Sequence, residues 1–282
     1  MRYPDAQRRS RIVPWLLAVT PLAVVPLAVA PTAVAHAQGS LAPSSPSGQS
    51  VTPVFEGWYH NKDGSYSLSF GYYNRNTAEQ MDVPIGNDNF VAPGAANQGQ
   101  PSSFSPRRHW GVFAVVVPAD FGSQQVVWTV KDRGQTFAIP GSLKPDWEID
   151  AVEGEASSNN TPPSLRFADR GTEGRGPLGV TSSPLRIRVG TPLALSVTVT
   201  DDAKTKAPVD LTWFKHQGPG TVSFSAPTSR LTPTGGTGTT TATFSRAGEY
   251  LVRVRANDLS AMTAGHAQCC WTNGFIPVTV LP

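Results

Sequence analysis

The sequence predicts an all-β protein with two β-sandwich-type domains in tandem, placed after a cleaved signal peptide. Three observations support this fold class. The chain starts with a basic segment followed by an apolar one, its later apolar residues alternate over short segments, and no long stretch has helical periodicity. The 26 glycines and 26 prolines supply the turns that short strands of period two require.

The first 37 residues have the layout of a secretory signal peptide. Four arginines precede an apolar stretch that runs from Ile12 to about Ala35 and ends in a small-x-small pattern before Gln38. A retained membrane anchor is the alternative, because about 20 apolar residues can span a bilayer. Prolines interrupt the stretch repeatedly, and each one disfavours a continuous helix. We therefore expect cleavage, no stable membrane span afterwards, and a secreted, periplasmic or cell-surface location.

Cleavage would also remove the apparent basicity of the chain. The first 37 residues hold four of the 23 basic residues and one of the 20 acidic residues, which leaves 19 of each sign. A neutral chain has no general attraction to phosphate backbones or acidic membranes. We therefore expect no nucleic-acid partner, and instead an extracellular or envelope protein or a polysaccharide.

The N-terminal β domain is predicted at residues 53–150, after a flexible lead at residues 38–52. In the segment 65–73, aromatic and aliphatic residues alternate with Ser and Gly, which predicts a strand buried on one face. Residues 109–117 are apolar on both faces, which predicts a central strand. The expected strands are residues 54–59, 65–73, 109–117, 126–130 and 135–139.

The C-terminal domain is predicted at residues 163–282, after a linker at residues 151–162 that is small, polar and without periodicity. Short alternating segments with turn signals between them again predict a β-sandwich. The expected strands are residues 165–167, as a first edge strand, then 193–199, 211–214, 222–224, 239–244, 250–256 and 276–280.

Three features of residues 190–282 carry a resemblance to a known fold family. Gly248-Glu249-Tyr250 precedes an alternating strand, Trp213 lies on the third expected strand, and the segment 193–199 has the pattern of a second strand. Together they resemble bacterial immunoglobulin-like or PKD-like domains. The resemblance implies that Tyr250 is the corner tyrosine of strand F and that Trp213 is a core residue. The usual disulfide between strands B and F is absent, and aliphatic residues stand there instead. The fold implies no particular activity, because it hosts many roles.

The chain as a whole resembles uncharacterised secreted bacterial proteins, which imply no activity either. The segments that carry this likeness are Glu56-Gly57-Trp58, Gly71-Tyr72-Tyr73-Asn74-Arg75-Asn76, His216-Gln217-Gly218-Pro219-Gly220 and Gln268-Cys269-Cys270-Trp271.

The two cysteines, Cys269 and Cys270, are adjacent. Disulfides normally join Cα atoms about 4.4–6.8 Å apart, whereas neighbouring Cα atoms are about 3.8 Å apart. A vicinal disulfide would close a small strained ring and stiffen the loop. Free thiols, a metal site and pairing between molecules are the alternatives.

Three acidic residues are expected to meet at one end of the immunoglobulin-like domain. Asp201 and Asp202 follow its strand B and Asp258 follows its strand F, and the loops after these strands cluster at one end of such a sandwich. Carboxylates suit Ca²⁺, the one cofactor we consider, while His266 and the cysteines nearby would suit a softer metal. The alternative is turn capping, since an Asp side chain in a turn can accept a hydrogen bond from the backbone N–H two residues further along.

The N-terminal domain is rich in aromatic residues, and Trp58, Tyr59 and Tyr73 are the candidates for binding. Adjacent residues of a strand point to opposite faces. At least one of Trp58 and Tyr59, and one of Tyr72 and Tyr73, is therefore expected to be exposed, where a ring can stack on a sugar. The alternative is core packing, for which aromatic residues are also favoured.

The sequence contains no nucleophile elbow, metalloprotease motif or phosphate-binding glycine loop, so we expect no enzymatic activity. The leading hypothesis is a non-catalytic binding or structural protein, such as a cell-surface, adhesion or assembly module. A carbohydrate-binding protein that uses the N-terminal aromatic residues is the alternative hypothesis. A secreted hydrolase is the third and least favoured hypothesis.

Overall fold

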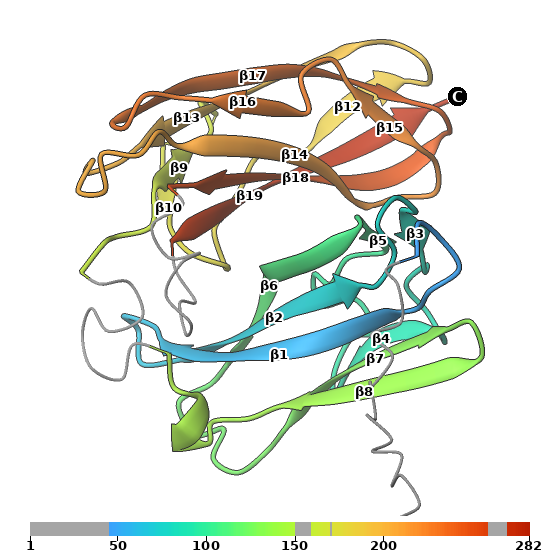
Figure 1. Cartoon of the computed structure of the whole chain (residues 1–282), viewed down its shortest axis with the longest axis vertical. Coiled ribbons are helices and arrows are strands. Elements are labelled where there is room, and N and C mark those ends of the chain that lie inside the picture. Colours follow the sequence, from blue (N-terminus) through green and yellow to red (C-terminus); the bar gives the residue numbers. More distant parts are fainter. Residues whose placement is uncertain (1–44, 150–158, 170, 259–269) are drawn as a thin grey trace, which may run out of the picture. The chain divides into compact units, whose positions relative to one another are not determined.

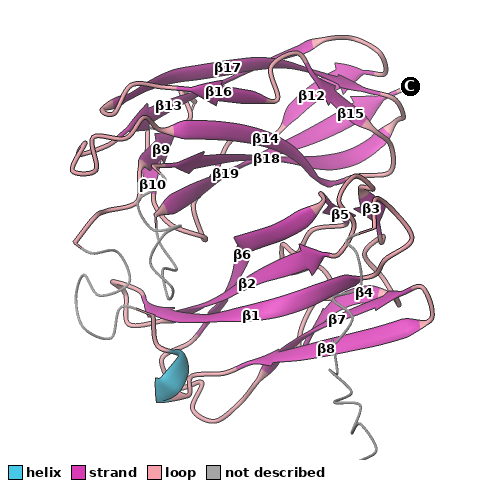
Figure 2. Cartoon of the chain, viewed as in Figure 1, coloured by secondary structure: helices cyan, strands magenta, loops and turns pink. Residues whose placement is uncertain are grey.

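The computed structural model describes residues 45–149, 159–169, 171–258 and 270–282. Within these ranges the protein is all-β, as predicted, with a single 3₁₀ turn, η1 (Pro145–Trp147) (Figure 2). The described residues contain no helix that is long and apolar enough to cross a membrane. The signal peptide, the lead up to residue 44 and residues 150–158 of the linker region lie outside the described residues and stay predictions.

The N-terminal lobe, residues 45–149, is built from two three-stranded antiparallel sheets and a two-stranded one (Figure 1). One sheet has the order β1-β2-β6, the second has the order β4-β7-β8, and the small one pairs β3 with β5. The strands are β1 (Val51–His60), β2 (Tyr66–Asn74), β3 (Met81–Asp82), β4 (Asn89–Ala92), β5 (Ser103–Phe104), β6 (Arg107–Val117), β7 (Val126–Asp132) and β8 (Gln135–Gly141).

Aromatic side chains fill the space between the two larger sheets of this lobe. The Phe70 ring stacks on Phe113 with centroids 5.3 Å apart, and Trp128 meets Phe113 edge-on at 5.0 Å. All three rings are almost fully buried. The Trp128 indole N–H donates a 3.0 Å hydrogen bond to the side chain of Asn89, so its polar edge is satisfied inside the core.

Two of the strand predictions for this lobe need correction. Residues 109–117 were expected in a central strand, but β6 lies at the edge of its sheet. Strand β2 was expected to be buried on one face, but Ser67, Ser69 and Gly71 on its second face are buried as well. The physical reason is the same for both strands. Other parts of the protein cover the outer face of this sheet, so a strand can be apolar or buried on both faces without being central in the sheet. A pattern within one strand does not reveal this cover.

The C-terminal lobe, residues 159–282, consists of two sheets that face each other (Figure 1). The first has the order β10-β9-β13-β17-β15, and the second has the order β11-β19-β18-β14-β16, with β12 also paired to β19. The strands are β9 (Ser164–Arg166), β10 (Glu173–Gly174), β11 (Val180–Thr181), β12 (Leu185–Arg188), β13 (Leu193–Thr200), β14 (Asp210–Gln217), β15 (Val222–Phe224), β16 (Thr228–Arg230), β17 (Gly235–Phe244), β18 (Gly248–Asn257) and β19 (Trp271–Leu281).

The second lobe has the immunoglobulin-like arrangement that the sequence predicted. If β9, β13, β14, β15, β17, β18 and β19 are strands A to G, the two sheets have the orders A-B-E-D and G-F-C. The Tyr250 hydroxyl donates a 2.9 Å hydrogen bond to the carbonyl oxygen of Arg246, which is the bond of a tyrosine corner. Trp213 is 3 % exposed and lies in the core.

Each lobe has its own cluster of buried apolar residues, one spanning Val51 to Val130 and the other spanning Leu165 to Val280. Strand β1 begins at Val51, inside the segment predicted as a flexible lead. The backbone N–H groups of Gly48 and Gln49 donate to Glu79 and Asn76. The exact domain boundaries remain predictions.

The β1-β2-β6 sheet contacts the second lobe at Gly111. The carbonyl oxygen of Gly111 accepts hydrogen bonds from the Trp271 indole, at 3.3 Å, and from the Asn273 amide, at 2.7 Å. A Cβ atom built on Gly111 would lie 2.5 Å from the Trp271 ring. Only glycine therefore allows this close approach between the lobes.

A second group of contacts between the lobes involves strand β14. The backbone N–H of Ser102 donates to the carbonyl oxygen of His216 at 2.8 Å, and the His216 Nε2 is 2.7 Å from the carbonyl oxygen of Gly99. Next to it, the buried Lys215 ammonium is 2.9 Å from the carboxylate of Asp82. The lobes are thus joined by specific polar contacts as well as by packing. Each buried hydrogen bond contributes about 1 kcal/mol to the stability of the folded state.

Candidate functional site

The three aromatic residues predicted to bind a ligand do not form one platform. Trp58 is 6 % exposed, and its indole N–H donates a 2.9 Å hydrogen bond to the carbonyl oxygen of Lys144. Tyr59 and Tyr73 are half-buried. Tyr73 pairs with Thr52, seven residues before Tyr59 on β1, so the two tyrosines lie about 20 Å apart along the strand. A continuous row of the three rings is therefore excluded.

Tyr59 lines a cleft of about 400 Å³ to which both lobes contribute. From the C-terminal lobe come the ring of Trp271 and the exposed side chain of Leu178, while Arg175 adds a cationic group. Sequence reasoning did not connect these residues with Tyr59, because they belong to another lobe and no local pattern marks them. The lining residues are Tyr59, His60, Asn61, Lys62, Ser67, Ala114, Ile149, Pro162, Arg175, Gly176, Pro177, Leu178 and Trp271.

The two histidines nearest the lobe interface are held in the neutral form. Burial, together with the positive charge of Arg253, lowers the pKa of His216 to about 3. Burial likewise lowers the pKa of His109 to about 3, with Arg253 and Arg255 adding to the effect. An imidazole with so low a pKa is a weak proton acceptor, whereas general acid–base catalysis works best with a pKa near the working pH.

Arg253, a neighbour of these histidines, lies in the interface with 2 % exposure. Its guanidinium carbon is 4.4 Å from the centroid of the Phe214 ring, and its Nη1 donates a 3.2 Å hydrogen bond to the Asn273 side chain. Burial lowers the pKa of Arg253 to about 9, so the side chain still carries its charge at neutral pH. The cation rests on an aromatic face rather than on a carboxylate.

The three aspartates predicted to hold Ca²⁺ lie at one end of the C-terminal lobe. Asp201 and Asp202 directly follow β13, and Asp258 directly follows β18. Burial raises the pKa of Asp201, and the negative charges of Asp258 and Asp202 raise it further. The fold thus brings the three carboxylates within electrostatic reach of one another.

Each of these carboxylates nevertheless has a protein partner. Asp201 and Asp202 each accept a 3.0 Å hydrogen bond from the backbone N–H two residues along the chain, which is the bond of an Asx turn. Asp258 accepts one from the side-chain amide of Asn160. Among the described residues, no group of three or more His, Cys, Asp or Glu is arranged to hold a metal ion. The geometry agrees with turn capping, and the Ca²⁺ site stays a prediction.

The predicted vicinal disulfide cannot be placed, because Cys269 lies outside the described residues, as does His266. Cys270 is fully buried directly before β19, with its Sγ 3.8 Å from the carbonyl oxygen of Asn160. The bond between the two cysteines therefore remains a prediction.

No protein-family model matches the chain, and no curated protein matches it in sequence. Among solved structures, it is similar to the D00-D0 domain of intimin, with 12 % identity over 83 % of this chain and 100 % of that one, and a TM-score of 0.28. It is also similar to domains 4 and 5 of the S-layer protein SbsC, with 14 % identity over 83 % of this chain and 98 % of that one, and a TM-score of 0.26. A third similar structure is WR4, a C. elegans MSP family member, with 6 % identity over 35 % of this chain and 94 % of that one, and a TM-score of 0.23. These likenesses are weak.

Proposed function

We propose that this protein is an exported, non-catalytic binding or structural module of the cell surface, in which two β-sandwich lobes act as one rigid body. The observation that carries the proposal is the polar interface between the lobes. Its buried groups hold the two lobes in one orientation, and the histidines near it are kept neutral by burial. A body of this kind presents fixed outer faces, as an adhesion or assembly module requires.

The rigidity of the lobe pair is testable at Gly111. Replacing it with alanine places a Cβ atom against the Trp271 ring, so Gly111→Ala should destabilise both lobes together. Gly134→Ala is the matched control, because Gly134 also has a positive φ but nothing lies within 4 Å of its added Cβ. By calorimetry, we expect one unfolding transition for the wild type and a larger loss of stability for the Gly111 variant. Separate transitions for the two lobes, or equal losses in the two variants, would contradict the rigid-body proposal.

Export and binding need their own measurement. We expect the protein outside the cytoplasm, with an N-terminus near Gln38, and saturable binding of the purified protein to isolated cell envelopes. An intact leader on cytosolic protein would refute export. Release of product from peptide, ester or polysaccharide substrates by the purified protein would refute the non-catalytic assignment.

Carbohydrate binding is the second candidate, and the cleft at Tyr59 is the observation that favours it. Its volume of about 400 Å³ is within the range of small-molecule sites. The rings of Tyr59 and Trp271 offer apolar contact, and His60, Asn61, Lys62 and Arg175 offer polar groups. A glycan array on the wild type and on Tyr59→Ala tests this candidate. Glycans that bind the wild type but not the variant would support it. If no glycan binds the wild type, adhesion or assembly remains the proposed function.

A further inference from the structure

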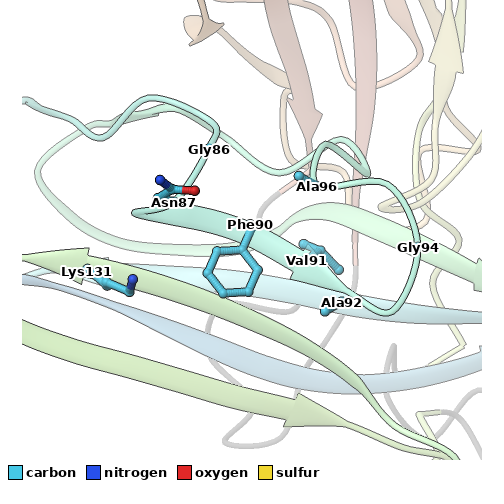
Figure 3. Close-up of a pocket in the computed structure, with 8 residues that line it drawn as sticks. All are labelled: Gly86, Asn87, Phe90, Val91, Ala92, Gly94, Ala96 and Lys131. Atoms are coloured by element: carbon cyan, nitrogen blue, oxygen red, sulfur yellow. The ribbon is translucent and has the colours of Figure 1, made fainter.

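The outer face of the β4-β7-β8 sheet carries a second hollow, separate from the cleft at Tyr59. It measures about 550 Å³ and lies over the end of β4 and the loops on either side. Figure 3 shows the Phe90 ring in the middle of this hollow, with Asn87 on one side of it and Lys131 on another. The lining residues are Gly86, Asn87, Phe90, Val91, Ala92, Gly94, Ala96 and Lys131.

Strand alternation explains why the Phe90 ring faces outward. On β4 the buried residues are Asn89 and Val91, which point into the sandwich core, while Phe90 and Ala92 are half-buried on the other face. Across the sheet, Phe90 pairs with Thr129 and Thr129 pairs with Ala138. Both neighbours in this row are small, so no bulky side chain of the row stands above the ring. A flat ligand can therefore lie on the half-buried Phe90 ring.

The loops around the hollow are held in place by side-chain hydrogen bonds. The Gln98 amide donates to three carbonyl oxygens, those of Val91, Pro93 and Ala95, at 3.3, 2.7 and 3.1 Å. The Gln100 amide donates to the carbonyl oxygen of Ala96 at 2.6 Å. On the opposite side, Gly86 and Asn89 exchange backbone hydrogen bonds of 3.0 and 3.3 Å. The walls are thus pre-organised, which lowers the entropic cost of binding.

The polar groups around the ring suit hydroxyl groups rather than an ion. The exposed amide of Asn87 offers both donors and an acceptor. The Lys131 ammonium lies 4.0 Å from the carboxylate of Asp88, and both side chains are well exposed, at 44 % and 66 %. Because these two charges offset each other, the hollow has no net attraction for an anion. A neutral ligand that combines an apolar face with many hydroxyls fits this arrangement.

We propose that this hollow binds a pyranose ring of a neutral glycan, with the ring stacked on Phe90 and its hydroxyls bonded to Asn87 and Lys131. A sugar ring presents an apolar C–H face to the aromatic ring and hydroxyls around its edge. A proline-rich peptide is less suitable, because such peptides dock in grooves lined by several aromatic rings. The site goes beyond the general binding function proposed above and does not depend on the cleft at Tyr59.

Titration calorimetry with hexasaccharides from cellulose, chitin and xylan tests this site. We expect at least one of them to bind the wild type, Phe90→Ala to weaken that binding about tenfold or more, and Asn87→Ala to weaken it about two- to tenfold. Trp147→Ala is the matched control, because Trp147 is 47 % exposed on the same lobe and does not line the hollow, and it should bind as the wild type does. Tyr59→Ala is measured beside it and shows whether a bound glycan lies in the other cleft instead. Alginate oligosaccharides, which are anionic, should bind more weakly than the neutral ones.

Several results would overturn the proposal. They are no binding of any neutral hexasaccharide by the wild type, unchanged binding by Phe90→Ala, loss of binding only in Tyr59→Ala, or preference for alginate or for a polyproline peptide. If circular dichroism shows that Phe90→Ala is not folded, Asn87→Ala and Lys131→Ala decide, because both positions are exposed. Binding that neither of these variants weakens would then refute the site. None of these results bears on export or on the rigidity of the lobe pair, which have their own tests.

Discussion

Acidification should destabilise the protein through His216. The ring is 2 % exposed, its Nε2 donates to the carbonyl oxygen of Gly99 at 2.7 Å, and Phe275 packs edge-on against it at 5.4 Å. Protonation would create a charge in this site next to Arg253, which is why the pKa is lowered to about 3. In the unfolded chain the pKa of histidine is about 6.5.

The sign and size of the effect follow from the two pKa values. Because the folded pKa of His216 is the lower one, the unfolded state binds the proton first as the pH falls. The stabilisation is complete above about pH 6.5 and is lost progressively toward pH 3. Between pH 7 and pH 4.5, the loss from His216 alone is between about 2 and 3 kcal/mol. This is a large share of the roughly 5–15 kcal/mol that stabilises a typical protein.

The assay is urea unfolding at pH 7 and pH 4.5 for the wild type, His216→Gln and His60→Gln. Other groups also titrate in this range, among them His109, with its lowered pKa, and Asp201 and Asp132, whose pKa values are raised by burial. The comparison between variants isolates His216, since glutamine cannot take up the proton. We expect His216→Gln to lose about 2–3 kcal/mol less than the wild type on acidification. His60→Gln, which removes an exposed histidine, should keep the wild-type loss.

Equal losses in the wild type and His216→Gln would refute this reasoning. So would an NMR titration in which the His216 ring takes up its proton near pH 6.5. Either result would mean that the ring is hydrated in solution and that the β14 contact between the lobes is looser than the structure describes.

Three further predictions concern single contacts. Tyr250→Phe removes the hydroxyl of the tyrosine corner and should cost about 1 kcal/mol of unfolding free energy in urea, while no loss would mean that the bond to the backbone is not formed in solution. Asp82→Asn leaves the buried Lys215 ammonium without its carboxylate and should cost about 1–3 kcal/mol at pH 7, an effect that must vanish in a Lys215→Met background if the pair is its cause. Mass spectrometry should show Cys269 and Cys270 joined, by a gain of about 2 Da on reduction, and an unchanged mass would rule the bond out.

The candidate sites were only partly accessible from the sequence. Alternation along single strands predicted that Trp58 and Tyr59 point to opposite faces, and that Tyr72 and Tyr73 do so as well. It therefore predicted that at least one residue of each pair is exposed. The aspartates could be assigned to one end of the second lobe, because the strand order of the immunoglobulin-like fold fixes which loops meet. The cleft could not be predicted, because Trp271 reaches Tyr59 only through the docking of the lobes. The hollow at Phe90 depends on loops whose shape is set by the Gln98 side chain.

The sequence by itself determined the all-β class and most strand positions, because each depends on residues close together in the chain. The resemblance to immunoglobulin-like domains added the tyrosine corner at Tyr250, which the structure confirms. Only the tertiary structure decided that β6 is an edge strand, that Gly111 must be glycine and that Arg253 is buried on Phe214. These features arise where one lobe covers a face of the other. A period-two pattern tells which residues share a face of a strand, but what covers that face depends on contacts between residues far apart in the chain.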